Sequence, residues 1–192
     1  MHISGFTRIN TQIRPGAELA VIHLNDGDGD GIPCENIRAT VSEIKDSISG
    51  IAVDSCGSDP LLCSDLYVIL KGLSVPHVGL MLMTQGSDPV NLDDVVGAGY
   101  VEFLDLEINS PISESQMRCI DVMRDNGRHY MVTITVSKDS FDEDSLHRTV
   151  MQMRDARHVV IRNVRDKNAL TQKELTELTK PLKGLVRDLK IV

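Results

Sequence analysis

The chain has 192 residues and a net charge of −8, with apolar residues at 41% and charged residues at 25%. This composition is typical of a globular protein, and the negative charge disfavours nucleic acid and anionic membranes as partners. No apolar run approaches the roughly 20 residues of a membrane helix and no signal-peptide pattern opens the chain, so we expect a cytoplasmic protein without a membrane partner.

Apolar runs rich in branched residues alternate with helical patterns along the chain. Each run is short, and each is followed by a segment whose apolar residues recur at helical spacing. In chain order, the pattern predicts a strand at 19–24, a helix at 37–48, a strand at 50–54, a helix at 60–73, a strand at 77–84, a helix at 91–99, a strand at 100–108, a helix at 113–127, a strand at 130–136, a helix at 142–156, a strand at 158–164, a helix at 171–185 and a short last strand at 189–192.

Several helix ends carry local signals. Ser113 is a predicted N-cap, and Thr171 with Glu174 forms a predicted capping box. The tetrapeptide Gly-Ser-Asp-Pro occurs at 57–60 and again at 86–89, and each copy is interpreted as a turn that caps the following helix.

The predicted strands are nearly continuously apolar, which is typical of a parallel sheet buried on both faces. Right-handed crossovers then give a sheet that is either doubly wound or curved into part of a barrel. No low-complexity linker divides the sequence, so residues 1–192 are predicted to form one α/β domain.

Acidic residues gather where the predicted strands end. Carboxyl ends of parallel strands meet at one edge of a sheet, so these side chains are expected around one mouth, which would attract cations or basic segments. For any one of them alone, a solvated turn is the favoured interpretation. The residues are Asp26, Asp28, Asp30, Glu35, Asp54, Asp59, Asp88, Asp105 and Glu107.

A resemblance runs over nearly the whole chain, from residues 3–24 through four central segments to residues 132–136, 141–146 and 158–165. Residues 21–36, VIHLNDGDGDGIPCEN, align without gaps on VxFxxGCNxRCxYCHN, and residues 56–66, CGSDPLLCSDL, on SGGEPxLQxDL. Residues 82–89 fall on DTNGxxP and residues 100–112 on YVxxDIKAP. In this order, the chain resembles the small radical S-adenosylmethionine activating enzymes of the pyruvate formate-lyase and anaerobic ribonucleotide reductase type. The resemblance implies a partial, six-stranded (β/α) barrel of parallel strands.

The chain departs from that family at the cluster motif. The family's CxxxCxxC falls on Gly27, Gly31 and Cys34. In the family, the three thiolates hold three irons of a 4Fe-4S cluster, and the fourth iron binds S-adenosylmethionine. Glycine has no side chain that can bind iron, so we expect a degenerate member without the cluster.

The positions equivalent to the family's cofactor contacts are partly changed. Gly57, Ser58 and Asp59 stand where the family has Gly-Gly-Glu, which contacts the amino group of S-adenosylmethionine. Asp105 keeps the aspartate of the family's Asp-Ile-Lys, whereas Glu107 replaces the lysine and reverses its charge.

A divalent cation is an alternative occupant of the loop. Asp26, Asp28 and Asp30 match the first, third and fifth positions of a calcium loop, but Cys34 and Ile37 stand where later ligands belong. Weak binding or a solvated turn is therefore expected. A metal site of Cys34, Cys56 and Cys63 is geometrically conceivable, but free thiols are the favoured interpretation.

Three hypotheses follow for the function. The leading one is a pseudoenzyme of an anaerobic pathway that binds or regulates a partner protein or a second copy, without a cofactor. The second is a module that binds S-adenosylmethionine or a cation, and the third is an enzyme with an unusual cysteine-bound metal or iron-sulfur site. Loss of the cluster would leave a cavity, which side chains such as Met81, Met83 and Leu62 fill or a partner covers.

Overall fold

The computed structural model describes residues 2–10, 13–14, 16–26, 30–55 and 57–192. Its centre is one sheet of eight strands in sequence order, in which β1 is antiparallel to β2 and all later neighbours are parallel. The strands are β1 His2–Asn10, β2 Leu19–Asn25, β3 Gly50–Ser55, β4 Leu80–Thr84, β5 Phe103–Ile108, β6 His129–Val136, β7 His158–Asn163 and β8 Leu189–Ile191.

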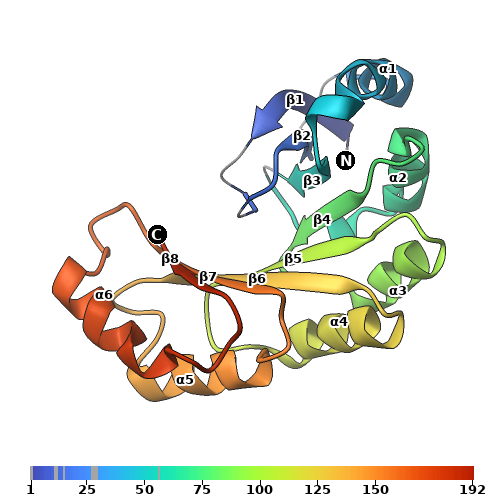
Figure 1. Ribbon diagram of the computed structural model, residues 1–192. Helices are drawn as coiled ribbons and strands as arrows, with labels where there is room; N and C mark the ends of the chain where they lie inside the picture. Colours follow the sequence, from blue (N-terminus) through green and yellow to red (C-terminus); the bar gives the residue numbers. More distant parts are fainter. Residues whose placement is uncertain (1, 11–12, 15, 27–29, 56) are drawn as a thin grey trace.

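Helices connect the parallel strands and cover the convex side of the curved, open sheet (Figure 1). None of the described helices is long and apolar enough to cross a bilayer. The α-helices are α1 Cys34–Ile44, α2 Leu66–Leu73, α3 Pro89–Gly97, α4 Glu114–Asp125, α5 Glu143–Gln152 and α6 Gln172–Thr179, and the short 3-10 helices are η1 Lys45–Ser47, η2 Pro60–Leu62 and η3 Lys180–Leu182.

The predicted parallel strands and the short last strand are confirmed, and β1 adds a strand that was not predicted. Differences at element ends have local causes. β4 begins only at Leu80 because His77 takes a left-handed turn with φ of 66° before it. The segment predicted as one helix at 60–73 is instead divided into η2 and α2.

The predicted caps are confirmed. Ser113 and Thr171 each form a capping box with the residue three positions later. In both Gly-Ser-Asp-Pro copies, the aspartate caps a helix whose first residue is the proline, at Asp59 for η2 and at Asp88 for α3.

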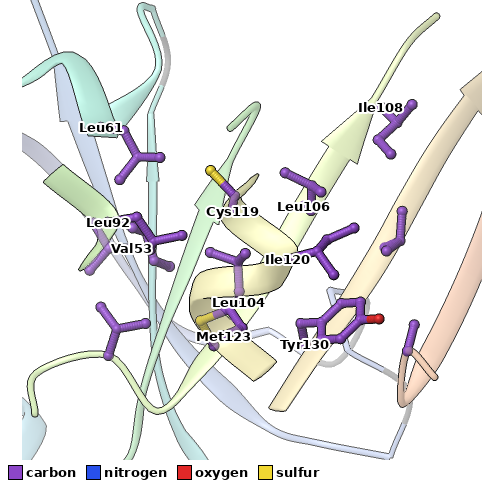
Figure 2. Packing of buried hydrophobic residues seen from close by; sticks show 14 of the residues in the cluster. Val53, Leu61, Leu92, Leu104, Leu106, Ile108, Cys119, Ile120, Met123 and Tyr130 are labelled. Atoms are coloured by element: carbon purple, nitrogen blue, oxygen red, sulfur yellow. The ribbon is translucent and has the colours of Figure 1, made fainter. Parts of the chain in front are cut away.

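The outer face of the sheet packs against the helices in the larger of two apolar clusters. Figure 2 shows Leu104 and Leu106 of β5 beside Ile120 and Met123 of α4. All four side chains are fully buried. Successive residues of a strand point to opposite faces, so Phe103, Asp105 and Glu107 point to the concave face.

The concave face carries a smaller apolar cluster that contains three methionines. Met81 and Met83 are buried there, whereas Leu62 is 60% exposed and lies outside this cluster. Methionine adapts to irregular space, which suits the interior of an open barrel. The cluster comprises Ala17, Leu19, Val21, Ala52, Met81, Met83, Phe103, Met131 and Val160.

Candidate functional site

The loops that follow β2 and β3 meet at one edge of the sheet, as predicted. Asp26 Oδ2 accepts a hydrogen bond of 3.0 Å from the backbone N–H of Ser58. Hydrogen bonding to Ser58, first through its side chain and then through its backbone N–H, lowers the pKa of Asp26. A Cβ built on Gly57 would lie 3.1 Å from the same carboxylate oxygen, so the glycine permits the close approach. Asp26 therefore joins the two loops.

Cys34 points away from the concave face. It begins α1 and packs at the margin of the outer cluster. A Cβ on Gly72 of α2 would lie 2.9 Å from Cys34 Cβ and 3.1 Å from its Sγ, so the thiol occupies space that this glycine leaves. Burial, and then the charge of Glu35, raises the pKa of Cys34. The raised pKa disfavours the thiolate form of Cys34, which is the form that binds a metal ion.

The other proposed metal ligands are not drawn together in the part of the chain that the structure describes. Cys63 is buried in the outer cluster, and Asp30 is exposed. Among described residues, no three histidine, cysteine or acidic side chains lie close enough to hold one metal ion. Gly27, Asp28 and Cys56 lie outside the described residues, so their share in such a site stays a prediction.

Asp59 has a structural task in addition to capping η2. Its carboxylate is 5% exposed and accepts four hydrogen bonds. The donors are Leu61 N at 3.1 Å, Thr84 Oγ1 at 2.5 Å, Gln85 N at 3.1 Å and Ser87 N at 2.9 Å. Asp59 thus ties the loop after β3 to the loop after β4, and its acceptor capacity is used within the protein.

The concave face contains a cavity of about 710 Å³, which we call the inner pocket. This volume lies within the usual range of small-molecule sites. Every parallel strand contributes at least one side chain, because inward-pointing residues of neighbouring strands lie side by side. In strand order these are His23, Asp54, Met83, Glu107, Thr135, Arg162 and Lys190.

Carboxylates on β3 and β5 form one wall of the inner pocket, with a third carboxylate beneath it. Burial, and then the charge of Asp54, raises the pKa of Glu107. Asp105 is 1% exposed, and burial followed by the charge of Glu107 raises its pKa to about 7. Thr133 Oγ1 donates to Asp105 Oδ1 at 3.0 Å, whereas Asp105 Oδ2 has no hydrogen-bond partner.

Basic side chains form the opposite wall. Arg162 of β7, Lys190 of β8 and Arg165 of the following loop line the inner pocket. Neither Arg162 nor Glu107 forms an ion pair with any residue in the described ranges. β6 separates the strands that carry these two residues, so Glu107 on the negative side and Arg162 on the positive side do not neutralise each other in an ion pair.

His23 lies between Asp54 and Thr7 of β1, at the β1 end of the wall that carries the carboxylates. Its Nδ1 lies 3.8 Å from Asp54 Oδ2, and its Nε2 lies 3.2 Å from Thr7 Oγ1. From the sequence alone, a histidine on a central strand such as His23 is interpreted as structural, and nothing there selects Arg162 or Lys190. The alternation of inward and outward residues along β7 and β8 was the signal that could have selected these two.

The chain matches no protein-family model and no curated protein sequence. Its fold is similar to that of SuiB from Streptococcus suis in complex with the precursor peptide SuiA, with a TM-score of 0.66 and 10% identity over 85% of this chain and 43% of SuiB. A radical SAM methyltransferase from Sphaerobacter thermophilus gives a TM-score of 0.65 and 11% identity over 94% of this chain and 67% of that one.

A third similar structure is the carboxyl transferase domain of Rhizobium etli pyruvate carboxylase with pyruvate. Its TM-score is 0.58 at 9% identity, over 83% of this chain and 32% of that one. The chain thus spans less than half the length of SuiB. These similarities define the class of fold, which is an open α/β barrel similar to the barrels of radical SAM enzymes and of the carboxyl transferase domain.

The residues at the cluster positions do not fit a 4Fe-4S cluster held as in the radical SAM activating enzymes. Gly27 and Gly31 offer no ligand atom, and the thiol of Cys34 packs against α2 on the helical side of the sheet. Such a cluster needs several thiolates directed to one point. No step that requires that cluster can therefore be assigned to this loop.

Proposed function

We propose that the chain is a catalytically degenerate protein of the radical SAM fold, which binds a small zwitterion in its inner pocket. The observation that supports this most is the division of charge in the pocket, with Asp54 and Glu107 on one side and Arg162 and Lys190 on the other. An ammonium or sulfonium group suits the first side, and a carboxylate suits the second.

The desolvation of the two sides favours such a ligand. The raised pKa of Glu107 shows that its charge is poorly compensated within the protein, and Arg162 is the cation that opposes this effect. A ligand that carries both charges compensates both walls at once without leaving a buried charge unpaired. A ligand with a single charge compensates only one wall.

S-adenosylmethionine is one molecule with this pattern, because it carries an ammonium, a sulfonium and a carboxylate group. A structure of SuiB, to which the fold is similar, contains S-adenosylmethionine. Here the ligand would be held without reductive cleavage, since the cluster positions do not fit a cluster. The protein partner or self-association expected from the sequence stays a prediction.

Ligand binding can be measured by thermal shift and calorimetry with S-adenosylmethionine, S-adenosylhomocysteine and methionine. We expect stabilisation that grows with ligand concentration. Glu107→Gln and Arg162→Gln should each weaken binding by about tenfold, because each removes a charge-assisted hydrogen bond. Glu143→Gln on α5 and Arg38→Gln on α1 change exposed residues away from the pocket and serve as matched controls.

Two outcomes of the binding measurements would contradict the proposal. If none of the three zwitterions stabilises the wild-type chain at millimolar concentration, the proposed ligand class is wrong. If one binds but with equal affinity to wild type, Glu107→Gln and Arg162→Gln, then the inner pocket is not its site.

A further inference from the structure

The opposite end of the sheet, where the parallel strands begin, carries a cluster of arginines. A hollow of about 790 Å³ is lined by Arg154, Arg157 and Arg187, together with His129 and His158. A smaller hollow of about 170 Å³ is lined by Arg14. His129 and Arg157 line both hollows, so the two are adjacent. We call Arg14, Arg154, Arg157 and Arg187 the arginine cluster.

The two carboxylates of the larger hollow are already engaged by other residues. Asp155 accepts hydrogen bonds of 2.6 Å from Arg124 Nε and 2.6 Å from Arg124 Nη2, and one of 2.5 Å from the Tyr130 hydroxyl. The Arg124 bonds lower the pKa of Asp155 to about 2. Asp188 Oδ2 lies 2.6 Å from His158 Nδ1. Neither carboxylate forms an ion pair with the arginine cluster.

The same contacts hold the arginines in place. Arg154 and Arg157 flank Asp155 in the loop between α5 and β7. Arg124 and Tyr130 fix Asp155, and the backbone N–H of Arg157 donates to the Tyr130 carbonyl at 2.9 Å. This loop is therefore anchored at its centre, while the exposed guanidinium groups beside it form no ion pair with any described residue.

Arg14 adds a buried donor without a partner. Its guanidinium lies over the ring of Phe103, 4.3 Å from the ring centroid, and its Nε is buried without a hydrogen bond. Burial, and then the positive charge of Arg157, lowers the pKa of Arg14. Glu102 also lines this hollow and forms no ion pair with Arg14 among the described residues. An anion between Arg14 and Arg157 would relieve both the repulsion and the unsatisfied donor.

We propose that the arginine cluster binds a small ligand with two linked phosphate groups. Planar guanidinium forks match phosphate oxygens in pairs, so arginine suits phosphate better than lysine does. Arg157 lines both hollows, which places it where two adjacent phosphates would meet. A small ligand is favoured over an acidic protein surface because Arg14, whose Nε is buried without a partner, lines a small hollow, and the net charge of −8 disfavours nucleic acid.

This inference is independent of the inner pocket. The inner pocket opens toward the carboxyl ends of the strands, whereas the arginine cluster surrounds their amino ends. Failure of one proposal therefore leaves the other intact. The two tests also use different ligands and different residues.

Calorimetric titration with pyrophosphate tests the proposal on the full chain. We expect binding that weakens with added salt, since exposed charges are screened. Arg157→Gln should lower the affinity by about tenfold or more, because it removes contacts in both hollows. Arg154→Gln and Arg187→Gln should lower it less, since each residue lines only the larger hollow. Arg38→Gln on α1 is the matched control and should bind as wild type does.

Circular dichroism on each variant establishes that the fold is kept, and Arg157→Lys provides a variant of conserved charge that should bind with intermediate affinity. Orthophosphate should bind more weakly than pyrophosphate. Equal pyrophosphate affinity for wild type and Arg157→Gln would overturn the proposal. Absence of pyrophosphate binding to the wild-type chain would also overturn the proposal. This holds even if a polyglutamate peptide or a DNA oligonucleotide binds instead.

Discussion

Replacing Asp105 by asparagine should stabilise the protein at alkaline pH. The Asp105 carboxyl is buried, one of its oxygens has no hydrogen-bond partner, and burial followed by the charge of Glu107 raises its pKa from 3.8 to about 7. The folded chain therefore keeps a proton that the unfolded chain releases above pH 3.8. The stability that this proton contributes is fully present below the unfolded pKa and is lost as the pH rises through about 7.

Asparagine has nearly the same shape and cannot ionise, and its carbonyl can still accept the hydrogen bond from Thr133. The stability advantage of Asp105→Asn over wild type should therefore grow between pH 5 and pH 8, by about 3 kcal/mol if the whole shift acts on folding. For a chain of this length, that difference corresponds to an increase in Tm advantage of roughly 6 to 12 °C.

Urea unfolding of both proteins at several pH values measures this difference directly. Asp94→Asn, on the exposed side of α3, is the control and should show no such growth. A constant difference between Asp105→Asn and wild type from pH 5 to pH 8 would show that Asp105 ionises in the ordinary range. The description of a buried, uncompensated carboxyl beneath the inner pocket would then be wrong.

Two further predictions concern the loops and the helical side. Asp59→Asn should lower the free energy of unfolding by about 3 kcal/mol, since it replaces a charged acceptor of four hydrogen bonds. Asp65→Asn is the control and should change this free energy little, because the Asp65 side chain makes no capping bond. Equal urea midpoints for the two variants would contradict the structural task of Asp59. Gly72→Ala should destabilise by about 1 to 3 kcal/mol because its Cβ would meet Cys34, whereas Gly97→Ala, in open space on α3, should stabilise by up to about 1 kcal/mol. If thermal unfolding shows Gly72→Ala to be as stable as Gly97→Ala, Cys34 does not pack against α2.

The parallel part of the fold could be predicted from the sequence because most of its strands are nearly continuously apolar and the helices between them have apolar residues at helical spacing. β1 could not be predicted in this way. It is an antiparallel edge strand whose register on β2 shifts twice, once between positions 3 and 5 and once between positions 7 and 10. Its apolar residues therefore do not alternate regularly. The start of β4 at Leu80 depends on the left-handed turn at His77, which the residue type does not signal.

The candidate site was predicted only in part. The positions of Asp26 and Asp59 at one edge follow from parallel topology, but their hydrogen bonds to neighbouring loops do not, because they depend on side-chain positions. Asp54 and Glu107 were expected at the mouth and do line the inner pocket. Arg162 was missed because the other residues that line the inner pocket lie mostly on other strands, far away in sequence.

The position of Cys34 shows a different limit. The alignment on a cluster motif suggested a thiol at the mouth, but the same residue also begins α1 beside Gly72. A helix contact between residues 34 and 72 cannot be derived from the spacing within the motif. The arginine cluster was missed for a related reason, because its members come from three separate loops and the overall charge of the chain is negative.

Anaerobic reconstitution with iron and sulfide tests the central claim most directly. The visible spectrum and the iron content measure the cluster, and product analysis with dithionite and S-adenosylmethionine measures reductive cleavage. We expect no stoichiometric 4Fe-4S cluster and no cleavage, because Gly27 and Gly31 cannot bind iron and Cys34 packs against α2. A cluster near one per chain that is lost in Cys34→Ala, together with cleavage of S-adenosylmethionine, would contradict the assignment of a degenerate binding protein.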